Sequence, residues 1–194
     1  MTTPRLILVA GANGAGKSTM TARLMKRFGS SLGVLLDADA LATALAPDNP
    51  SRAAISAGRL TLALLERALQ RRERVIYETT LSDKKRHLDL LQHAQNLGFK
   101  TWVFYIGLDD PQMHLERVKQ RFSVGGHDIL DADILRRFER SRANLPAAIR
   151  LSDRTMIYDN SGRDFRLVAS LARGILRRSS GTGWWTPLLP STED

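Results

Sequence analysis

The chain has 194 residues, of which 43% are hydrophobic and 25% are charged, a composition typical of one globular domain and not of a disordered chain. It has no cysteine, which excludes disulfides and thiolate metal sites, and no apolar run approaches the roughly 20 residues of a membrane helix, so a cytoplasmic protein is expected. The formal net charge of +9 suits anionic partners such as nucleotides, sugar nucleotides, RNA or an acidic protein, without choosing among them.

Short apolar runs alternate with segments of helical periodicity along most of the chain. The predicted strands are residues 5–10, 33–36, 75–77, 100–106 and 155–158. In chain order, the predicted helices are residues 18–28, residues 41–45, a helix capped by Ser51, a helix that ends at Gly98, residues 111–122, an arginine-rich helix from about residue 132 and residues 165–176. This alternation predicts an α/β domain with three layers, in which helices cover both faces of a parallel sheet of about five strands.

The α/β domain is expected to span residues 1–178, and residues 179–194, rich in Ser, Gly, Thr and Pro, are expected to form a C-terminal tail. Two adjacent tryptophans, Trp184 and Trp185, lie in this tail. They either pack back onto the domain, as large aromatic side chains usually do, or contact a partner or a second copy. The sequence leaves both interpretations open.

The turn after the first predicted strand fits a phosphate-binding P-loop. Residues 11–18 read Gly-Ala-Asn-Gly-Ala-Gly-Lys-Ser and match G-x-x-x-x-G-K-[ST] in full, between a strand and a helix. The glycines let consecutive N–H groups converge on phosphate oxygens, and the helix adds its positive N-terminal end. We expect a P-loop NTPase fold in which Lys17 reaches the β- and γ-phosphates of ATP and the Ser18 hydroxyl binds Mg²⁺. The residues expected to contact ATP are Gly11, Ala12, Asn13, Gly14, Ala15, Gly16, Lys17, Ser18 and Thr19.

Three carboxylates come at the ends of predicted strands, where an open parallel sheet binds its ligands. Asp37 and Asp39 end the second strand, and two residues apart on an extended chain they would point the same way. Glu78 ends the third strand. Such acids can hold Mg²⁺, bind substrate hydroxyls or accept a proton from an attacking hydroxyl, and Asp37 is expected to serve the metal. The alternative for Asp39 is a helix N-cap.

Basic residues gather between the fourth and fifth predicted strands, in a segment expected to form a helical lid at about residues 117–145. They are Arg117, Lys119, Arg121, Arg136, Arg137, Arg140 and Arg142. Phosphoryl transfer builds charge on the transferring oxygens and needs cations placed there, so this segment is typical of the arginine-bearing lid of a small kinase. The alternative is a solvated basic helix.

The ordered set of these motifs resembles the zeta toxin family of P-loop kinases, over residues 6 to 162. The resemblance is carried by Gly-Ala-Asn-Gly-Ala-Gly-Lys-Ser-Thr at the P-loop, Asp37-Ala38-Asp39, Glu78-Thr79-Thr80-Leu81-Ser82, Gly125-Gly126-His127, residues 136–145 and Tyr158-Asp159-Asn160-Ser161. The P-loop alone is shared by many families, and the ordered set is more specific.

The resemblance implies an activity. Zeta toxins use ATP to phosphorylate the 3′-hydroxyl of the sugar in UDP-N-acetylglucosamine, which blocks cell-wall precursor synthesis. By motif position, the implied roles are general base for Asp39, ATP and Mg²⁺ binding for Lys17 and Ser18, sugar-nucleotide binding for Glu78 and Thr80, and neutralisation of the γ-phosphate for Arg121 with Arg137 or Arg140. The family also implies an antitoxin protein as a partner.

Two other interpretations stay open. One is a kinase for another hydroxyl, such as that of an antibiotic, a small metabolite or an RNA end; nucleic acid is not the expected partner, but the charge makes RNA worth testing. The other is an ATP-binding module without catalysis, which would lack a base, and the presence of Asp39 argues against it.

Overall fold

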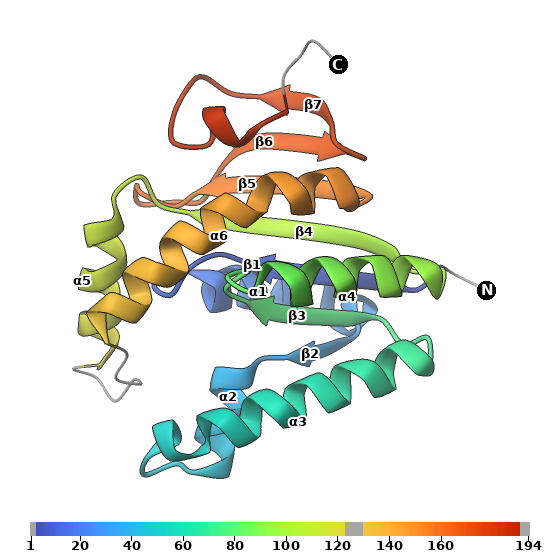
Figure 1. Cartoon of the computed structure of the whole chain (residues 1–194), viewed down its shortest axis with the longest axis vertical. Coiled ribbons are helices and arrows are strands. Elements are labelled where there is room, and N and C mark those ends of the chain that lie inside the picture. Colours follow the sequence, from blue (N-terminus) through green and yellow to red (C-terminus); the bar gives the residue numbers. More distant parts are fainter. Residues whose placement is uncertain (1–2, 123–129, 191–194) are drawn as a thin grey trace.

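A mixed seven-stranded sheet forms the centre of the computed structural model, which describes residues 3–122 and 130–190 (Figure 1). The strands are β1 (Arg5–Ala10), β2 (Val34–Leu36), β3 (Val75–Thr79), β4 (Lys100–Gly107), β5 (Arg154–Asp159), β6 (Arg166–Ala172) and β7 (Ile175–Ser179). The helices are α1 (Lys17–Phe28), α2 (Ala38–Leu45), α3 (Pro50–Gln70), α4 (Lys84–Asn96), α5 (Pro111–Phe122) and α6 (Asp131–Leu151), with short 3₁₀ turns η1 (Gly29–Leu32) and η2 (Thr186–Leu188). Gly125-Gly126-His127 lies outside the described residues.

The strand order is β2-β3-β1-β4-β5-β6-β7, and the first five strands in this order are parallel. β1 is central because its apolar side chains alternate between two buried faces. The prediction of a P-loop NTPase fold with a parallel sheet is therefore confirmed. The carboxyl ends of β1 and its neighbours β3 and β4 meet at one edge, where such sheets bind ligands.

The predicted helix at 165–176 is wrong, because this segment forms the antiparallel hairpin β6–β7. Val168, Ala169 and Leu171 of β6 are buried and belong to the larger hydrophobic core cluster. Between the two strands, Arg173 and Gly174 both have positive φ angles, 50° and 77°, as the tight turns of β-hairpins require. The apolar residues fit a helical period as well as a strand, and packing beside β5 decides in favour of the strand.

Two helix starts also differ from prediction. α2 begins three residues earlier than expected, because the Asp37 side chain caps it by accepting a hydrogen bond from the Asp39 N–H at 2.9 Å. α3 begins at Pro50 with Asn49 as its N-cap, so Ser51 is not the cap. Proline suits the first helical position, where its missing N–H is not needed.

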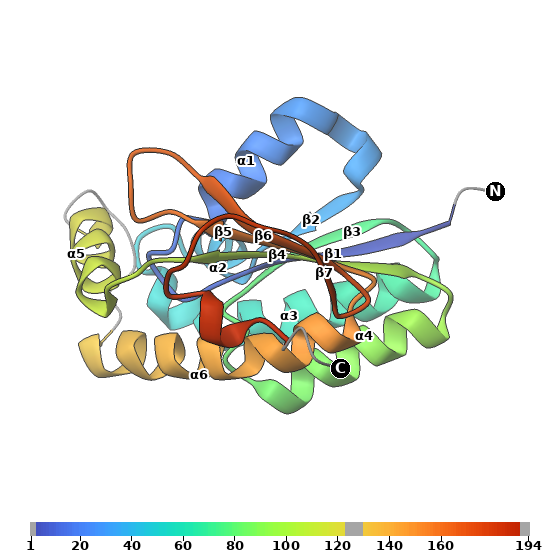
Figure 2. The ribbon, with the colours of Figure 1, turned by 90° about the horizontal axis from the view of Figure 1, so that it is seen from above.

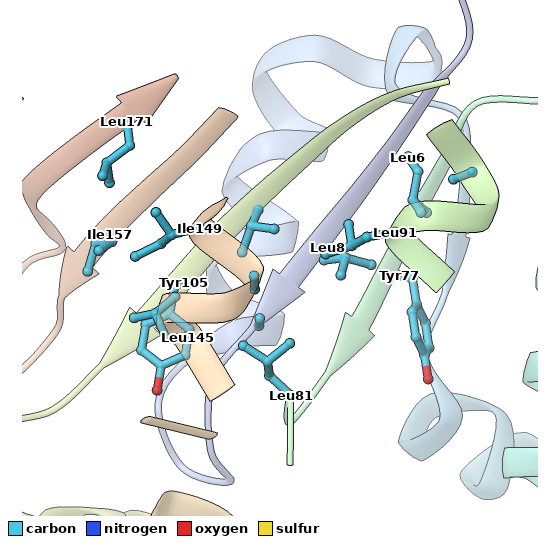
Figure 3. Packing of buried hydrophobic residues seen from close by; sticks show 14 of the residues in the cluster. Leu6, Leu8, Tyr77, Leu81, Leu91, Tyr105, Leu145, Ile149, Ile157 and Leu171 are labelled. Carbon is cyan, nitrogen blue, oxygen red and sulfur yellow. The ribbon is translucent and has the colours of Figure 1, made fainter. Parts of the chain in front are cut away.

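The sheet has two unequal apolar layers. Leu6 and Leu8 point to the face covered by α3, α4 and α6, where most buried side chains gather (Figure 2, Figure 3). Ile7 and Val9 point to the other face, which α1 covers (Figure 2). Within the described ranges, no helix combines the length and apolar character needed to cross a bilayer.

The two tail tryptophans pack onto this core, with exposed fractions of 6% for Trp184 and 2% for Trp185. The Trp184 indole N–H donates to the Asp159 carboxylate at 3.2 Å, and the Arg142 guanidinium donates to the Trp184 carbonyl at 2.8 Å. The segment around η2 is therefore part of the folded unit.

Candidate active site

The P-loop between β1 and α1 has the backbone shape that its glycines predict. Gly11, Gly14 and Gly16 have φ angles of 145°, 78° and 102°, which disfavour side chains. A Cβ on Gly14 would lie 2.7 Å from the backbone oxygen of His114, so α5 approaches the loop too closely for any other residue. Gly16 is the N-cap of α1 and offers no side-chain cap, which leaves the first N–H groups of the helix available to an anion.

Three other elements hold this loop. After β5, the Asn160 amide donates to the Ala15 carbonyl at 2.8 Å. From α5, the His114 ring contacts the Asn13 carbonyl through Nδ1 at 2.7 Å, and from α6 the Arg137 guanidinium donates to the Asn13 side chain at 3.1 Å. The phosphate-binding backbone is thus fixed before any nucleotide arrives.

His114 is a buried neutral imidazole. Burial lowers its pKa to about 4, because the charged form would lose its hydration, and the nearby cation Lys17 adds to this effect. With its pKa this low, the ring is uncharged at neutral pH, so its Nδ1–H donates to Asn13.

Lys17 and Ser18 lie at the start of α1, facing the acids. The Lys17 ammonium donates to the Ala12 carbonyl at 3.2 Å, inside its own loop. Burial lowers the pKa of Lys17, and attraction to Asp39, Glu78 and Asp37 opposes that shift. The Ser18 hydroxyl donates to the Glu78 carboxylate at 3.0 Å.

The carboxylates reach the site in a different way from the one predicted. Asp39 belongs to the first turn of α2, and Asp37 is the N-cap of that helix, so the argument from an extended chain is wrong although both side chains line the same cavity. Asp39 is exposed, while Glu78 is buried at the end of β3. Burial raises the pKa of the Glu78 carboxyl, and repulsion from Asp37 adds to this shift.

A cavity of about 700 Å³ opens at the carboxyl ends of the strands and gathers most of the predicted site residues. Those that line it are Asn13, Gly14, Gly16, Lys17, Ser18, Thr19, Asp37, Asp39, Glu78, Thr80, Arg121 and Arg137. Gly11, Ala12 and Ala15 are buried members of the loop itself and shape its backbone.

The lid arginines are separated by their positions on α5 and α6. Arg121 and Arg137 line the cavity, whereas Arg140 is exposed on α6 and is not among the lining residues. Arg136 forms an ion pair within α6, with the Asp133 carboxylate at 2.6 Å. The helix face explains the difference, because Arg137 lies three residues after the fully buried Ile134 and shares its side of α6.

Residues that follow β3 form another wall of the cavity. Thr80 exchanges a hydrogen bond with Ser82 at 2.8 Å, and between them Leu81 is fully buried with a positive φ of 57°. This unusual backbone is held by the buried Asn144 of α6, whose amide donates to the Leu81 carbonyl at 2.8 Å. One helix therefore supports both the P-loop, through Arg137, and this wall.

Several cavity residues were not assigned a role from the sequence. Arg59 of α3 and Arg86 of α4 line the same cavity as Thr80 and Ser82, and Arg117 of α5 lines it while donating to the Asn160 carbonyl at 2.8 Å. Asn160 follows the carboxyl end of β5, so the rule that led to Glu78 would also have found it. No sequence signal marks Arg59 or Arg86, because their helices are amphipathic and basic residues are common on solvated faces.

The oxygen ligands at this site fit Mg²⁺ only if phosphate oxygens complete the coordination. No group of three histidine or carboxylate side chains within residues 3–122 and 130–190 could hold a metal ion by itself. Mg²⁺ in nucleotide sites is usually held by one or two protein oxygens together with phosphates and water. The hydrogen-bonded pair of Ser18 and Glu78, with Asp37 nearby, matches that requirement.

Comparison with known proteins agrees with this geometry. The family model described as "AAA domain" matches residues 6–146. An uncharacterized protein of Haemophilus influenzae is 31% identical over 128 residues, which cover 66% of this chain and 87% of that protein.

Two solved structures share the fold at low identity. One comes from the PezAT chromosomal toxin–antitoxin system of Streptococcus pneumoniae, with a TM-score of 0.65 and 18% identity over 86% of this chain and 71% of that chain. The other is the AvrRxo1-ORF1:ORF2 complex with ATP, with a TM-score of 0.70 and 18% identity over 90% of this chain and 60% of the matched chain. This chain thus spans about three fifths of the AvrRxo1 chain that it matches.

Proposed function

The chain belongs to the AAA domain family, and from that premise we propose that it is an ATP-dependent kinase that phosphorylates a hydroxyl group of a sugar nucleotide. The observation that carries the proposal is the shared cavity, in which the P-loop, the Ser18–Glu78 pair, the exposed Asp39 and two lid arginines meet. A module that only binds ATP has no need of an exposed carboxylate beside the P-loop lysine.

The proposed reaction gives each of these groups a role. The γ-phosphate lies over Lys17 and the N–H groups of α1. Asp39 accepts the proton of the acceptor hydroxyl while the hydroxyl oxygen forms a bond to the γ-phosphorus. The bond between the γ-phosphorus and the β–γ bridging oxygen breaks, and ADP leaves. When bound, Mg²⁺ neutralises phosphate charge and orients the β- and γ-phosphates. Arg121 and Arg137 stabilise the charge on the transferring oxygens, and Arg137 must release Asn13 to do so.

The acceptor half of the cavity supports an anionic acceptor. Arg59 of α3 and Arg86 of α4 lie on a wall that also carries the Thr80 and Ser82 hydroxyls. Arg86 pairs with the Asp83 carboxylate at 3.5 Å, so the net positive charge of this wall comes from Arg59. Guanidinium groups recognise diphosphates and hydroxyls recognise sugars. Together with the zeta toxin resemblance, this favours the 3′-hydroxyl of UDP-N-acetylglucosamine.

A protein partner belongs to the proposal. PezAT is a toxin–antitoxin system, and by its likeness to that structure we infer that an antitoxin protein pairs with this chain.

The test is an acceptor panel. The purified protein is incubated with γ-labelled ATP and, separately, UDP-N-acetylglucosamine, free N-acetylglucosamine and a 5′-hydroxyl RNA oligonucleotide. We expect label in the sugar nucleotide and little in the free sugar, which lacks the diphosphate. Label in RNA alone would show that the acceptor is RNA and not a sugar nucleotide. Label only in free phosphate would contradict the kinase proposal.

A further inference from the structure

A second cavity lies on the α1 face of the sheet and shares no lining residue with the candidate active site. Its volume is about 530 Å³. Aromatic side chains of β4 and β5 form its floor, namely Trp102, Phe104 and Tyr158, and α1 forms one wall. We call this cavity the arginine-rimmed groove, because Arg5, Arg23, Arg27 and Arg74 surround it.

The groove exists because this face of the sheet is only partly covered. Strands of a parallel sheet are normally buried beneath helices on both faces. Here α3, α4 and α6 cover one face and α1 lies on the other (Figure 2). As a result Trp102, Met156 and Tyr158 pack on the core only in part, and Phe28 at the end of α1 is 48% exposed.

Guanidinium groups stack on aromatic rings in and beside the groove. The Arg5 guanidinium lies 3.9 Å and that of Arg154 5.3 Å from the Trp102 ring centroid, and that of Arg23 lies 4.8 Å from the Phe165 ring centroid. Guanidinium groups stacked in this way keep their N–H edges free for carboxylates.

Like charges lie close together around Arg5. Burial and the like charges of Arg74 and Arg154 lower the pKa of Arg5. In the described part of the chain, no carboxylate lies within ion-pairing distance of Arg5, Arg27 or Arg154, while Arg23 has an exposed partner, Asp164, at 3.6 Å. A partner that supplies carboxylates would remove this repulsion.

We propose that the arginine-rimmed groove binds an acidic amphipathic segment of a partner protein, with apolar side chains against Leu24, Phe28 and Tyr158 and carboxylates on the arginines. A second copy of this chain fits less well, because an isologous contact would bring two basic rims together. Single-stranded nucleic acid needs free aromatic faces for its bases, whereas those of Trp102 and Phe165 carry guanidinium groups.

The experiment uses fluorescence anisotropy with three labelled helical peptides of about 18 residues, long enough to lie along α1. One places leucines on one face and glutamates on the other, the second is its scramble, and the third has lysine in place of glutamate. We expect the acidic amphipathic peptide to bind at least about tenfold more tightly than either control, with affinity that falls as salt is added. Added MgATP leaves this binding unchanged.

Variants locate the binding site. Arg27→Glu and Phe28→Ser change the rim and the exposed end of the α1 wall without touching the buried core, and each should weaken binding about fivefold or more. Arg67→Glu reverses an exposed charge on α3, across the sheet, and should have no effect. Equal binding of the scramble, no effect of Arg27→Glu, or tighter binding of a single-stranded RNA of similar length would each overturn the proposal.

Discussion

At the residue scale, the two candidate lid arginines of α6 give a matched pair. Arg137 lines the cavity and contacts Asn13, whereas Arg140 is exposed three residues later. We predict that Arg137→Ala lowers single-turnover phosphoryl transfer about 10²- to 10³-fold, because charge on the transferring oxygens loses a donor. Arg140→Ala should stay within about twofold of wild type. Equal losses in both variants would show that α6 places a different face at the site.

His114 makes folding depend on pH. Its pKa is about 4 in the folded protein against 6.5 when unperturbed, so between these values the unfolded chain binds a proton that the folded protein does not. Stability is therefore lost as pH falls from about 6.5 to about 4, by up to about 3 kcal/mol. His114→Gln keeps a donor for Asn13 but does not titrate in this range.

Urea unfolding of both proteins at about pH 7 and pH 5 measures this effect. The pH-dependent loss should be smaller in His114→Gln, and subtraction removes the contribution of carboxylates common to both proteins. Identical losses would contradict the assignment.

The residues of the P-loop were predictable because a fixed spacing is required to wrap a phosphate. The contact of His114 with the loop was not, because its partner is a backbone carbonyl distant in sequence, at Asn13. The choice between Arg137 and Arg140 was within reach, since Ile134, Leu145 and Ala148 already mark the buried face of α6.

At the scale of elements, α6 supports the strained turn after β3. Asn144→Ala removes the donor to the Leu81 carbonyl and leaves a buried polar group unpaired, at an expected cost of about 1–3 kcal/mol in the free energy of unfolding. The matched control is Asn96→Ala, at an exposed amide near the end of α4, which should change stability by about 0.5 kcal/mol or less. Urea titration distinguishes the two, and equal costs would contradict the role given to Asn144.

The parallel strands were predictable from their apolar runs, since strands buried on both faces leave little choice of residue. The hairpin β6–β7 was not, because its apolar residues fit either period and its turn is Arg-Gly rather than the more common Asn-Gly. Asp39 was predicted to face the cavity because an extended chain was expected there. It lines the cavity for another reason, since Asp37 caps a helix that carries Asp39 in its first turn.

At the scale of the whole molecule, the tail completes the core behind the site. Trp184 contacts Asp159, which directly precedes Asn160, and Asn160 supports the P-loop. Truncation after Ser180 removes both buried tryptophans, and we predict a loss of several kcal/mol of stability or failure to fold. Thermal unfolding followed by circular dichroism measures this, and a truncated chain with the wild-type Tm would show that the tail is dispensable.

Under the proposed function, ATP and the acceptor hydroxyl meet at Asp39 in one cavity. The most direct test is Asp39→Asn, with ATP affinity measured by calorimetry and transfer to UDP-N-acetylglucosamine followed in a single turnover. We predict that ATP affinity stays within about twofold of wild type, while transfer falls about 10²-fold or more because the hydroxyl proton has no acceptor. Transfer at the wild-type rate in this variant would contradict the central claim.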